Sequence, residues 1–71
     1  MLKIANEAAL EPFVESALLA SEKAAADYRR GKRAAIKQIV GRVMRESGGR
    51  ADPILAERML EARLNAVESE N

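Results

Sequence analysis

The sequence predicts an all-α fold, a small bundle of three to four short helices, and three observations support this. Alanine, leucine, glutamate, arginine and lysine dominate the 71 residues, which is typical of helical proteins. No segment alternates apolar and polar side chains for long enough to form a strand. Proline, serine and glycine interrupt the chain at intervals that suit short helices. The length allows one domain with a small core.

The first helix is predicted over residues 8–20, and its start is open. Pro12 lacks an N–H, so it fits only if the helix begins within about one turn of it. Asn6 is a candidate cap for an earlier start. Apolar residues recur at a spacing of three and four, which places them on one helix face: Leu10, Phe13, Val14, Ala17 and Leu18.

The second helix is predicted over residues 22–30. Ser21 is its expected N-cap, and Gly31 ends it because glycine adopts the left-handed conformation at little cost. Tyr28 is more typical of a packing residue with its hydroxyl at the surface than of a platform for a base.

The third and fourth helices are predicted over residues 32–46 and from Pro53 to about Asn65. The third has one apolar arc, and residues 47–49 should form a mobile loop after it. Asp52 should cap the fourth helix, and residues 66–71 should fray. The arc of the third helix consists of Ile36, Ile39, Val40, Val43 and Met44.

The net charge of +1 conceals a segregated pattern. Residues 1–22 contain one base and four acids, and residues 51–71 contain two bases and five acids. Residues 23–50 contain nine bases and two acids. A basic centre between acidic ends can form intramolecular ion pairs, or it can present a positive face to a polyanion.

The composition excludes several classes of function. Without histidine or cysteine, the chain lacks the usual general base, the usual zinc ligands and any disulfide. Phe13 and Tyr28 are its two aromatic residues, too few for a stacking platform. No uncharged stretch approaches the roughly 20 apolar residues that cross a bilayer, and no signal peptide is recognisable. We expect a soluble, cytoplasmic chain with no membrane partner, no catalytic residue and no metal site.

Two basic groups are candidate sites. On the third helix, Lys37, Gly41 and Arg45 form one row, so a residue without a side chain lies between two cations. A helical glycine costs about 1 kcal/mol relative to alanine, and either of two roles offsets that cost. It allows close approach of a sugar–phosphate backbone, or it allows another helix to pack closely; from composition alone, packing is favoured.

The second group, Arg29 to Arg33, lies where two helices meet. It is either a phosphate grip or a solvated turn whose arginines pair with Glu22 or Asp27. The full set of candidate nucleic-acid contacts is Arg29, Arg30, Lys32, Arg33, Lys37, Gly41, Arg42 and Arg45.

One stretch has a recognisable pattern. Between Asp27 and Pro53 the chain reads D-Y-x-x-G-K-x-x-A-x-x-x-x-V-G-x-V-M-x-x-x-x-G-x-A-x-P, and Leu60 and Leu64 follow. This closely resembles the GatB/YqeY domain, the C-terminal tail of the B subunit of the aspartyl/glutamyl-tRNA amidotransferase. The resemblance extends from about residue 10 to residue 64. Asp52 stands where the family commonly has asparagine, and Lys37 and Gln38 stand where it often has small or apolar residues.

The resemblance implies a non-catalytic helical domain at the end of a longer subunit. In that family, the rest of the B subunit uses ATP and Mg²⁺ to phosphorylate the side-chain carboxylate of the misacylated tRNA. A partner subunit delivers ammonia from glutamine, and the tail contacts the outer corner of the tRNA. The implied partners are tRNA and, through the full-length protein, the A and C subunits. The residues contain no phosphate loop, so ATP would bind elsewhere in such a subunit, and the first residue is expected to begin a fragment.

Two alternatives remain. Standalone YqeY proteins and some glutaminyl-tRNA synthetases carry a similar tail, so the host protein can differ. The domain can also be a helical protein–protein docking module whose basic face meets an acidic partner.

Overall fold

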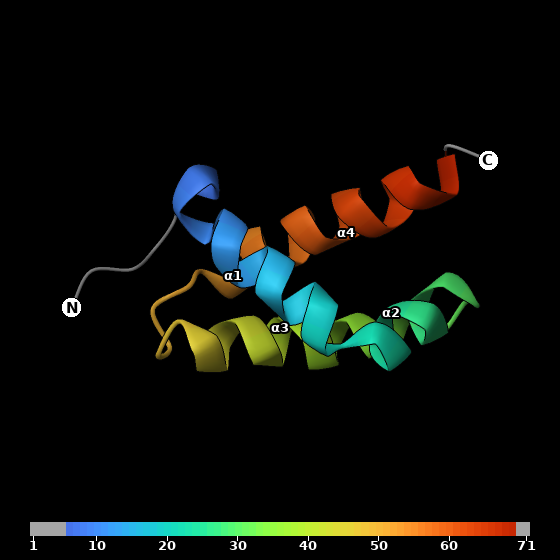
Figure 1. Ribbon diagram of the computed structural model, residues 1–71, viewed down its shortest axis with the longest axis horizontal. Helices are drawn as coiled ribbons and strands as arrows, with labels where there is room; N and C mark the ends of the chain where they lie inside the picture. The colour runs from blue at the N-terminus through green and yellow to red at the C-terminus, as the bar shows by residue number, and fades with distance from the viewer. Residues whose placement is uncertain (1–5, 70–71) are drawn as a thin grey trace.

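The computed structural model describes residues 6–69, and side chains as far as Asn65. Within this range the chain forms four α-helices and one 3₁₀ turn, with no strand, which confirms the all-α prediction (Figure 1). The elements are α1 (Glu7–Ala20), α2 (Glu22–Arg29), η1 (Arg33–Ala35), α3 (Ile36–Glu46) and α4 (Pro53–Ser69).

The helices form an elongated bundle with extents of 40 × 19 × 18 Å. α3 packs against both α1 and α4, and α2 packs against η1 and α3. Figure 1 shows that α2 and the C-terminal half of α4 diverge toward one end of the molecule.

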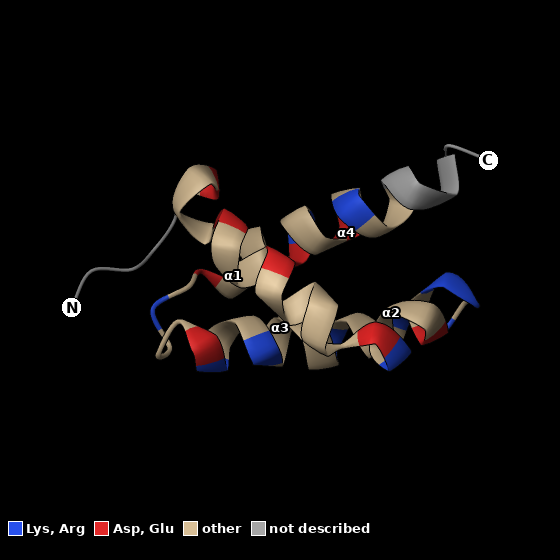
Figure 2. Ribbon diagram, in the orientation of Figure 1, with Lys and Arg blue, Asp and Glu red and all other residues tan. Residues whose placement is uncertain are grey.

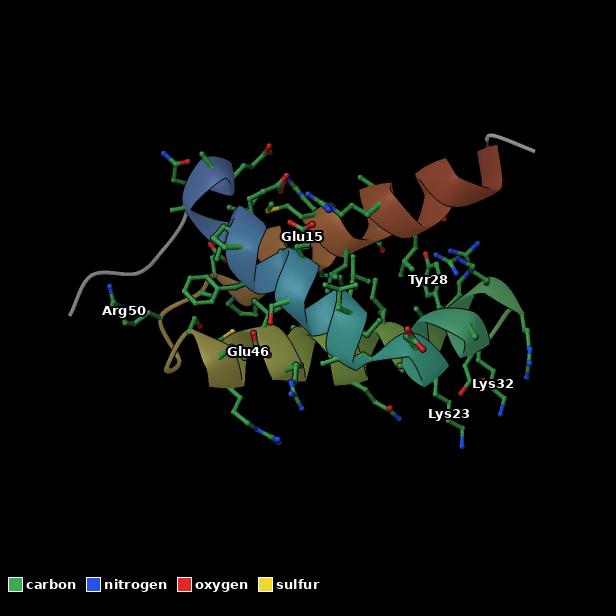
Figure 3. The ribbon with its side chains drawn as sticks, in the orientation of Figure 1. Glu15, Lys23, Tyr28, Lys32, Glu46 and Arg50 are labelled. Carbon is green, nitrogen blue, oxygen red and sulfur yellow. The ribbon has the colours of Figure 1, made fainter. Side chains whose placement is uncertain are left out.

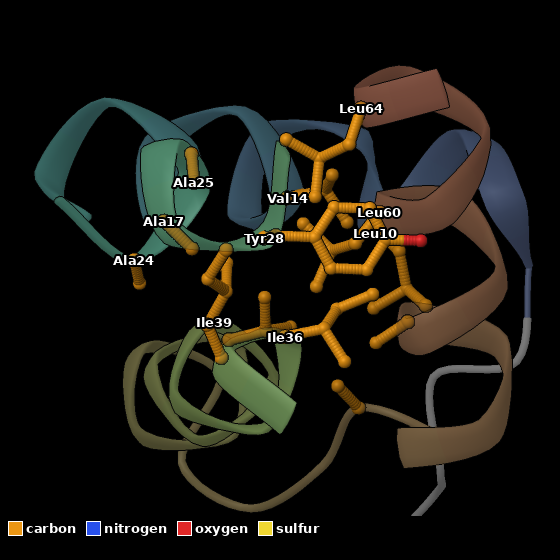
Figure 4. Packing of buried hydrophobic residues seen from close by; sticks show 14 residues of the cluster. Leu10, Val14, Ala17, Ala24, Ala25, Tyr28, Ile36, Ile39, Leu60 and Leu64 are labelled. Atoms are coloured by element: carbon orange, nitrogen blue, oxygen red, sulfur yellow. The ribbon is translucent and has the colours of Figure 1, made fainter. Parts of the chain in front are cut away.

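A single apolar core fills the space between the helices, and all four of them contribute to it (Figure 4). Leu10, Ile39 and Leu60 are completely buried, and they come from α1, α3 and α4. Tyr28 on α2 is 6% exposed, so its predicted role as a packing residue is confirmed. Its hydroxyl accepts a hydrogen bond from Nη1 of Arg33 at 3.5 Å.

Side chains before α1 and α4 determine where these helices begin. Oδ1 of Asn6 accepts a hydrogen bond from the N–H of Ala8 at 2.8 Å, so α1 has the earlier of the two expected starts. Pro12 therefore lies inside α1 and removes the N–H that would bond the Ala8 carbonyl in a regular helix, a cost that water can offset because Ala8 is exposed. Before α4, Oδ1 of Asp52 accepts from the N–H of Ile54 at 3.0 Å, which confirms the predicted cap.

Glycines end α2 and α3 in the same way. The N–H of Gly31 donates to the carbonyl of Tyr28 at 3.0 Å, and the N–H of Lys32 donates to that of Asp27 at 3.0 Å. This pair of bonds is a Schellman motif, and Gly31 has the positive φ of 111° that it requires. Gly48 and Gly49 close α3 with the equivalent pair of bonds.

Several predicted boundaries need correction. α2 ends one residue earlier than predicted, and α3 begins at Ile36 because residues 33–35 form the 3₁₀ turn η1. α4 continues to Ser69, beyond the predicted end at Asn65. Fraying of residues 66–71 stays a prediction, and residues 70–71 lie outside the described range.

The α3–α4 loop is anchored by a buried hydroxyl. Oγ of Ser47 donates to the carbonyl of Met44 and accepts from the N–H of Ala51, both at 3.1 Å. Ser47 is also the one buried polar residue among those described. The loop thus has an internal hydrogen-bonded anchor, and its mobility remains a prediction.

Candidate nucleic-acid interface

The amphipathic pattern of α3 determines which of its residues face outward. Ile36, Ile39 and Val43 are buried in the core. The opposite side of α3 is therefore exposed to solvent, and it carries Lys37, Gln38, Gly41, Arg42 and Arg45. The α3 residues that were predicted to face solvent are therefore exposed.

Gly41 lies in an open part of that surface. A Cβ atom built at this position meets no heavy atom within 4 Å, apart from its own helix backbone and immediate neighbours. The interpretation of Gly41 as a helix-packing residue, favoured from composition, is therefore wrong for the described part of the chain. A helical glycine costs about 1 kcal/mol relative to alanine, and no contact among these residues offsets that cost.

A polar groove surrounds Gly41. It has a volume of about 380 Å³ and is open to solvent. α3 forms one side of the groove, and Ser21, at the junction between α1 and α2, forms the other. The lining residues are Ser21, Gln38, Gly41, Arg42 and Arg45, from segments that lie 17 or more positions apart. We call it the Gly41 groove.

One cation of the Gly41 groove is held by a carboxylate. Nε of Arg42 donates to Oε2 of Glu46 at 3.0 Å, one turn further along α3. This contact lowers the pKa of Glu46 below its ordinary value, and a hydrogen bond from Ser16 acts in the same direction. Arg45 has no ion-pair partner among the described side chains. Arg45 is therefore the more available of the two guanidinium groups.

Lys37 does not join this groove. Its Nζ lies 3.4 Å from Oε1 of Glu57 on α4, and the Lys37 side chain is 73% exposed. The predicted row on α3 is therefore divided, with Lys37 turned toward α4 and Arg45 lining the Gly41 groove. The Lys37–Glu57 pair is a surface contact that contributes about 0–1 kcal/mol to stability. Breaking it to let Lys37 bind a phosphate would therefore cost little free energy.

The second predicted group is dispersed around the α2–η1 turn. Arg30 lies 3.9 Å from Asp27, as expected for a solvated turn, and the Arg33 guanidinium lies 5.7 Å from the centre of the Tyr28 ring. Arg29 lines a different groove, between α2 and α4. Lys32 is exposed, with no ion pair to a described residue.

The charges remain separated in space. Figure 2 shows acidic residues along α1 and basic residues at the α2–η1 turn. Figure 3 shows that Lys23 and Lys32 extend away from the bundle on the same side. Lys23 is exposed and was not among the predicted contacts.

Two lining residues of the Gly41 groove, Ser21 and Gln38, were not among the predicted contacts. Ser21 was expected to cap α2, and it occupies the N-cap position, but its side chain makes no capping hydrogen bond. Gln38 shares the exposed side of α3 with Gly41, and helical spacing was sufficient to place it there. The position of Ser21 opposite α3 depends on tertiary packing and has no local sequence signal.

Metal clusters and membrane-spanning helices are absent from the described residues. No group of three or more histidine, cysteine, aspartate or glutamate residues is placed there to hold a metal ion. Among the helices in this part of the chain, none is both long enough and apolar enough to cross a membrane.

The chain is similar to known proteins along most of its length. The model of the GatB domain family matches residues 1–64. The B subunit of the aspartyl/glutamyl-tRNA(Asn/Gln) amidotransferase of Thermomicrobium roseum is 44% identical over 90% of this chain and 13% of that protein. The corresponding B subunits from Clostridium acetobutylicum and Methanopyrus kandleri are 41% and 38% identical over 83% and 93% of the chain.

The chain spans about an eighth of the length of these relatives, 12–14% of each. No solved structure matches it. Because the family model covers nine-tenths of its residues, the chain belongs to the GatB domain family.

Proposed function

We propose that this chain is a tRNA-binding appendage of a glutamine-dependent aspartyl/glutamyl-tRNA amidotransferase, and that its basic helical face positions the tRNA. The observation that carries the proposal is the open surface at Gly41, where a bare helix backbone lines the same groove as the exposed side chains of Arg42 and Arg45. A sugar–phosphate backbone can approach such a surface closely and place its phosphates against the cations. The names of the relatives support tRNA as the nucleic acid.

The interaction would recognise backbone shape and charge more than base identity. Arginine binds phosphate oxygens in a planar, two-pronged geometry, whereas lysine acts as a point charge. Arg45 would supply the first kind of contact, and Lys23 and Lys32 would extend the positive surface beyond the groove. The domain would therefore hold the tRNA in position, and the selection of its bases would lie elsewhere.

Within a full-length protein, this domain would carry out no chemistry of its own. ATP and Mg²⁺ would be used by other parts of the B subunit, and the A and C subunits would be met through the larger assembly. The contribution of the domain would then be the orientation of the tRNA, which converts a bimolecular step into an effectively unimolecular one.

The proposal is tested by measuring tRNA binding to the 71-residue chain by fluorescence anisotropy at several salt concentrations. Arg45→Glu should weaken binding and reduce the slope of log affinity against log salt by about one for each lost phosphate contact. The matched control is Arg58→Glu, the same charge reversal at an exposed position on α4 outside the groove. Equal losses of tRNA affinity in both variants would show that binding depends on the net charge of the chain and not on a defined face, which would contradict the proposal. Binding of an acidic protein as tightly as tRNA would also count against the proposal.

A docking module remains the second candidate, and one observation favours it. A groove of about 630 Å³ between α2 and α4 also has Leu18 and Leu19 of α1 in its lining, and Leu19 is 71% exposed. Exposed leucine beside a concave surface is common at protein contacts. Substitution of Leu19 by aspartate should leave tRNA binding unchanged if the leading proposal is correct.

A further inference from the structure

Two neutral polar side chains in the Gly41 groove have unused hydrogen-bonding capacity. The hydroxyl of Ser21 makes no capping bond to α2. The amide of Gln38 is exposed, and no hydrogen bond joins it to another described residue. Both groups donate and accept hydrogen bonds, and both line the same groove as the open backbone of Gly41.

This lining is more than a phosphate site needs. Phosphate oxygens only accept hydrogen bonds, so a site for phosphate alone gains little from the accepting oxygens of a hydroxyl and an amide. The charge of the groove is also modest, because Glu46 holds Arg42 at 3.0 Å and offsets one of its two cations. A ligand group that is neutral and both donates and accepts fits better beside Ser21 and Gln38, with its phosphates near the two arginines.

The 2′-hydroxyl of ribose has this chemistry, and it is the group that distinguishes RNA from DNA. We propose that the Gly41 groove is a ribose site. Ser21 and Gln38 hydrogen-bond a 2′-hydroxyl there, Arg42 and Arg45 contact the neighbouring phosphates, and the absence of a side chain at Gly41 admits the sugar. This inference rests on the proposed binding of nucleic acid and adds the selection of RNA over DNA at named residues.

The arrangement separates affinity from selectivity. The cations act through charge, so their contribution depends on salt and little on the 2′-substituent. The neutral side chains act through hydrogen bonds, so their contribution depends on the 2′-substituent and little on salt. A variant that lacks one of the neutral groups should therefore lose selectivity for RNA while it retains the salt dependence.

The test uses the 71-residue chain and two hairpins of one sequence, one of ordinary RNA and one with 2′-fluoro sugars. The 2′-fluoro hairpin keeps the A-form helix but cannot donate a hydrogen bond from the 2′-position. Anisotropy at fixed salt should show about fivefold tighter binding of the ordinary RNA, which corresponds to one hydrogen bond. Gln38→Met and Ser21→Ala should each reduce that ratio toward one without changing the salt slope.

Ile54→Met is the matched control, since it places a methionine at an exposed helical position outside the groove, and it should preserve the ratio. Circular dichroism melting checks that every variant remains folded. Equal binding of the two hairpins by the unchanged chain would overturn the ribose site and leave nucleic-acid binding intact. A ratio that survives both substitutions would also overturn it. Binding of neither hairpin, nor of tRNA, would overturn the proposed function and the ribose site with it.

Discussion

Replacing Gly41 tests whether the surface of α3 is open, because stability and RNA binding should respond in opposite directions. Gly41 lies in the middle of α3 and has no positive φ, so alanine or leucine can adopt its backbone conformation without strain. A Cβ there meets nothing within 4 Å, so the added side chain extends into solvent and the groove. Gly41→Ala and Gly41→Leu should therefore stabilise the fold by about 0.5–1 kcal/mol through helix propensity.

For a domain of this size, 1 kcal/mol raises the midpoint of thermal unfolding by about 4–8 °C, which circular dichroism at 222 nm resolves easily. Gly41→Leu should at the same time weaken tRNA binding by about tenfold, because its side chain keeps the sugar–phosphate backbone from approaching α3. Tenfold corresponds to a loss of about 1.4 kcal/mol of binding free energy. Ala62→Leu, at an exposed position on α4, is the control for adding apolar surface. A lower midpoint for Gly41→Leu, through overpacking of typically 1–3 kcal/mol, would refute the interpretation of an open surface.

The remaining predictions concern charge, acid stability, the core and catalysis. Arg45→Glu should weaken tRNA binding more than Lys37→Glu, because Lys37 is turned toward α4, and neither should change the free energy of unfolding by more than about 0.5 kcal/mol in denaturant titrations. The lowered pKa of Glu46 contributes stability above its unfolded-state pKa, and this contribution is lost as the pH falls through its folded-state pKa. Glu46→Gln should therefore lower the urea midpoint at pH 7 more than it does below about pH 4. Leu10→Ala removes a completely buried side chain, and a cost of about 2–5 kcal/mol should leave this small domain largely unfolded by circular dichroism. The purified chain should hydrolyse no ATP, and turnover that scales with its concentration after repurification would contradict this.

Local patterns predicted most of the fold. Asp52 followed by proline predicted the start of α4, and the structure confirms both the helix and its cap. Gly31 predicted the end of α2 because a Schellman motif requires its positive φ. The start of α3 was predicted too early. A 3₁₀ turn and the first turn of an α-helix share similar residues and backbone angles, so the sequence did not separate them.

The site was predicted less completely, because its geometry depends on contacts between distant segments. Helical spacing placed Gly41 and Arg45 on an exposed face, but it gave no sign that Lys37 lies beside Glu57, twenty positions away. Ser21 carried a misleading local signal. A serine before a helix is usually a cap, and its position opposite α3 follows from the packing of α1 and α2.

The separation of charge seen along the bundle has a kinetic consequence. With a net charge of only +1, the molecule has almost no monopole, but acidic α1 and the basic α2–η1 turn together give it an electric dipole. In the field of a polyanion such a dipole turns the basic end forward before contact, so a larger share of collisions is productive. Salt shortens the range of that torque to roughly 8 Å at physiological ionic strength. The molecule is therefore oriented only when it comes within about this distance of the polyanion, just before the encounter complex forms.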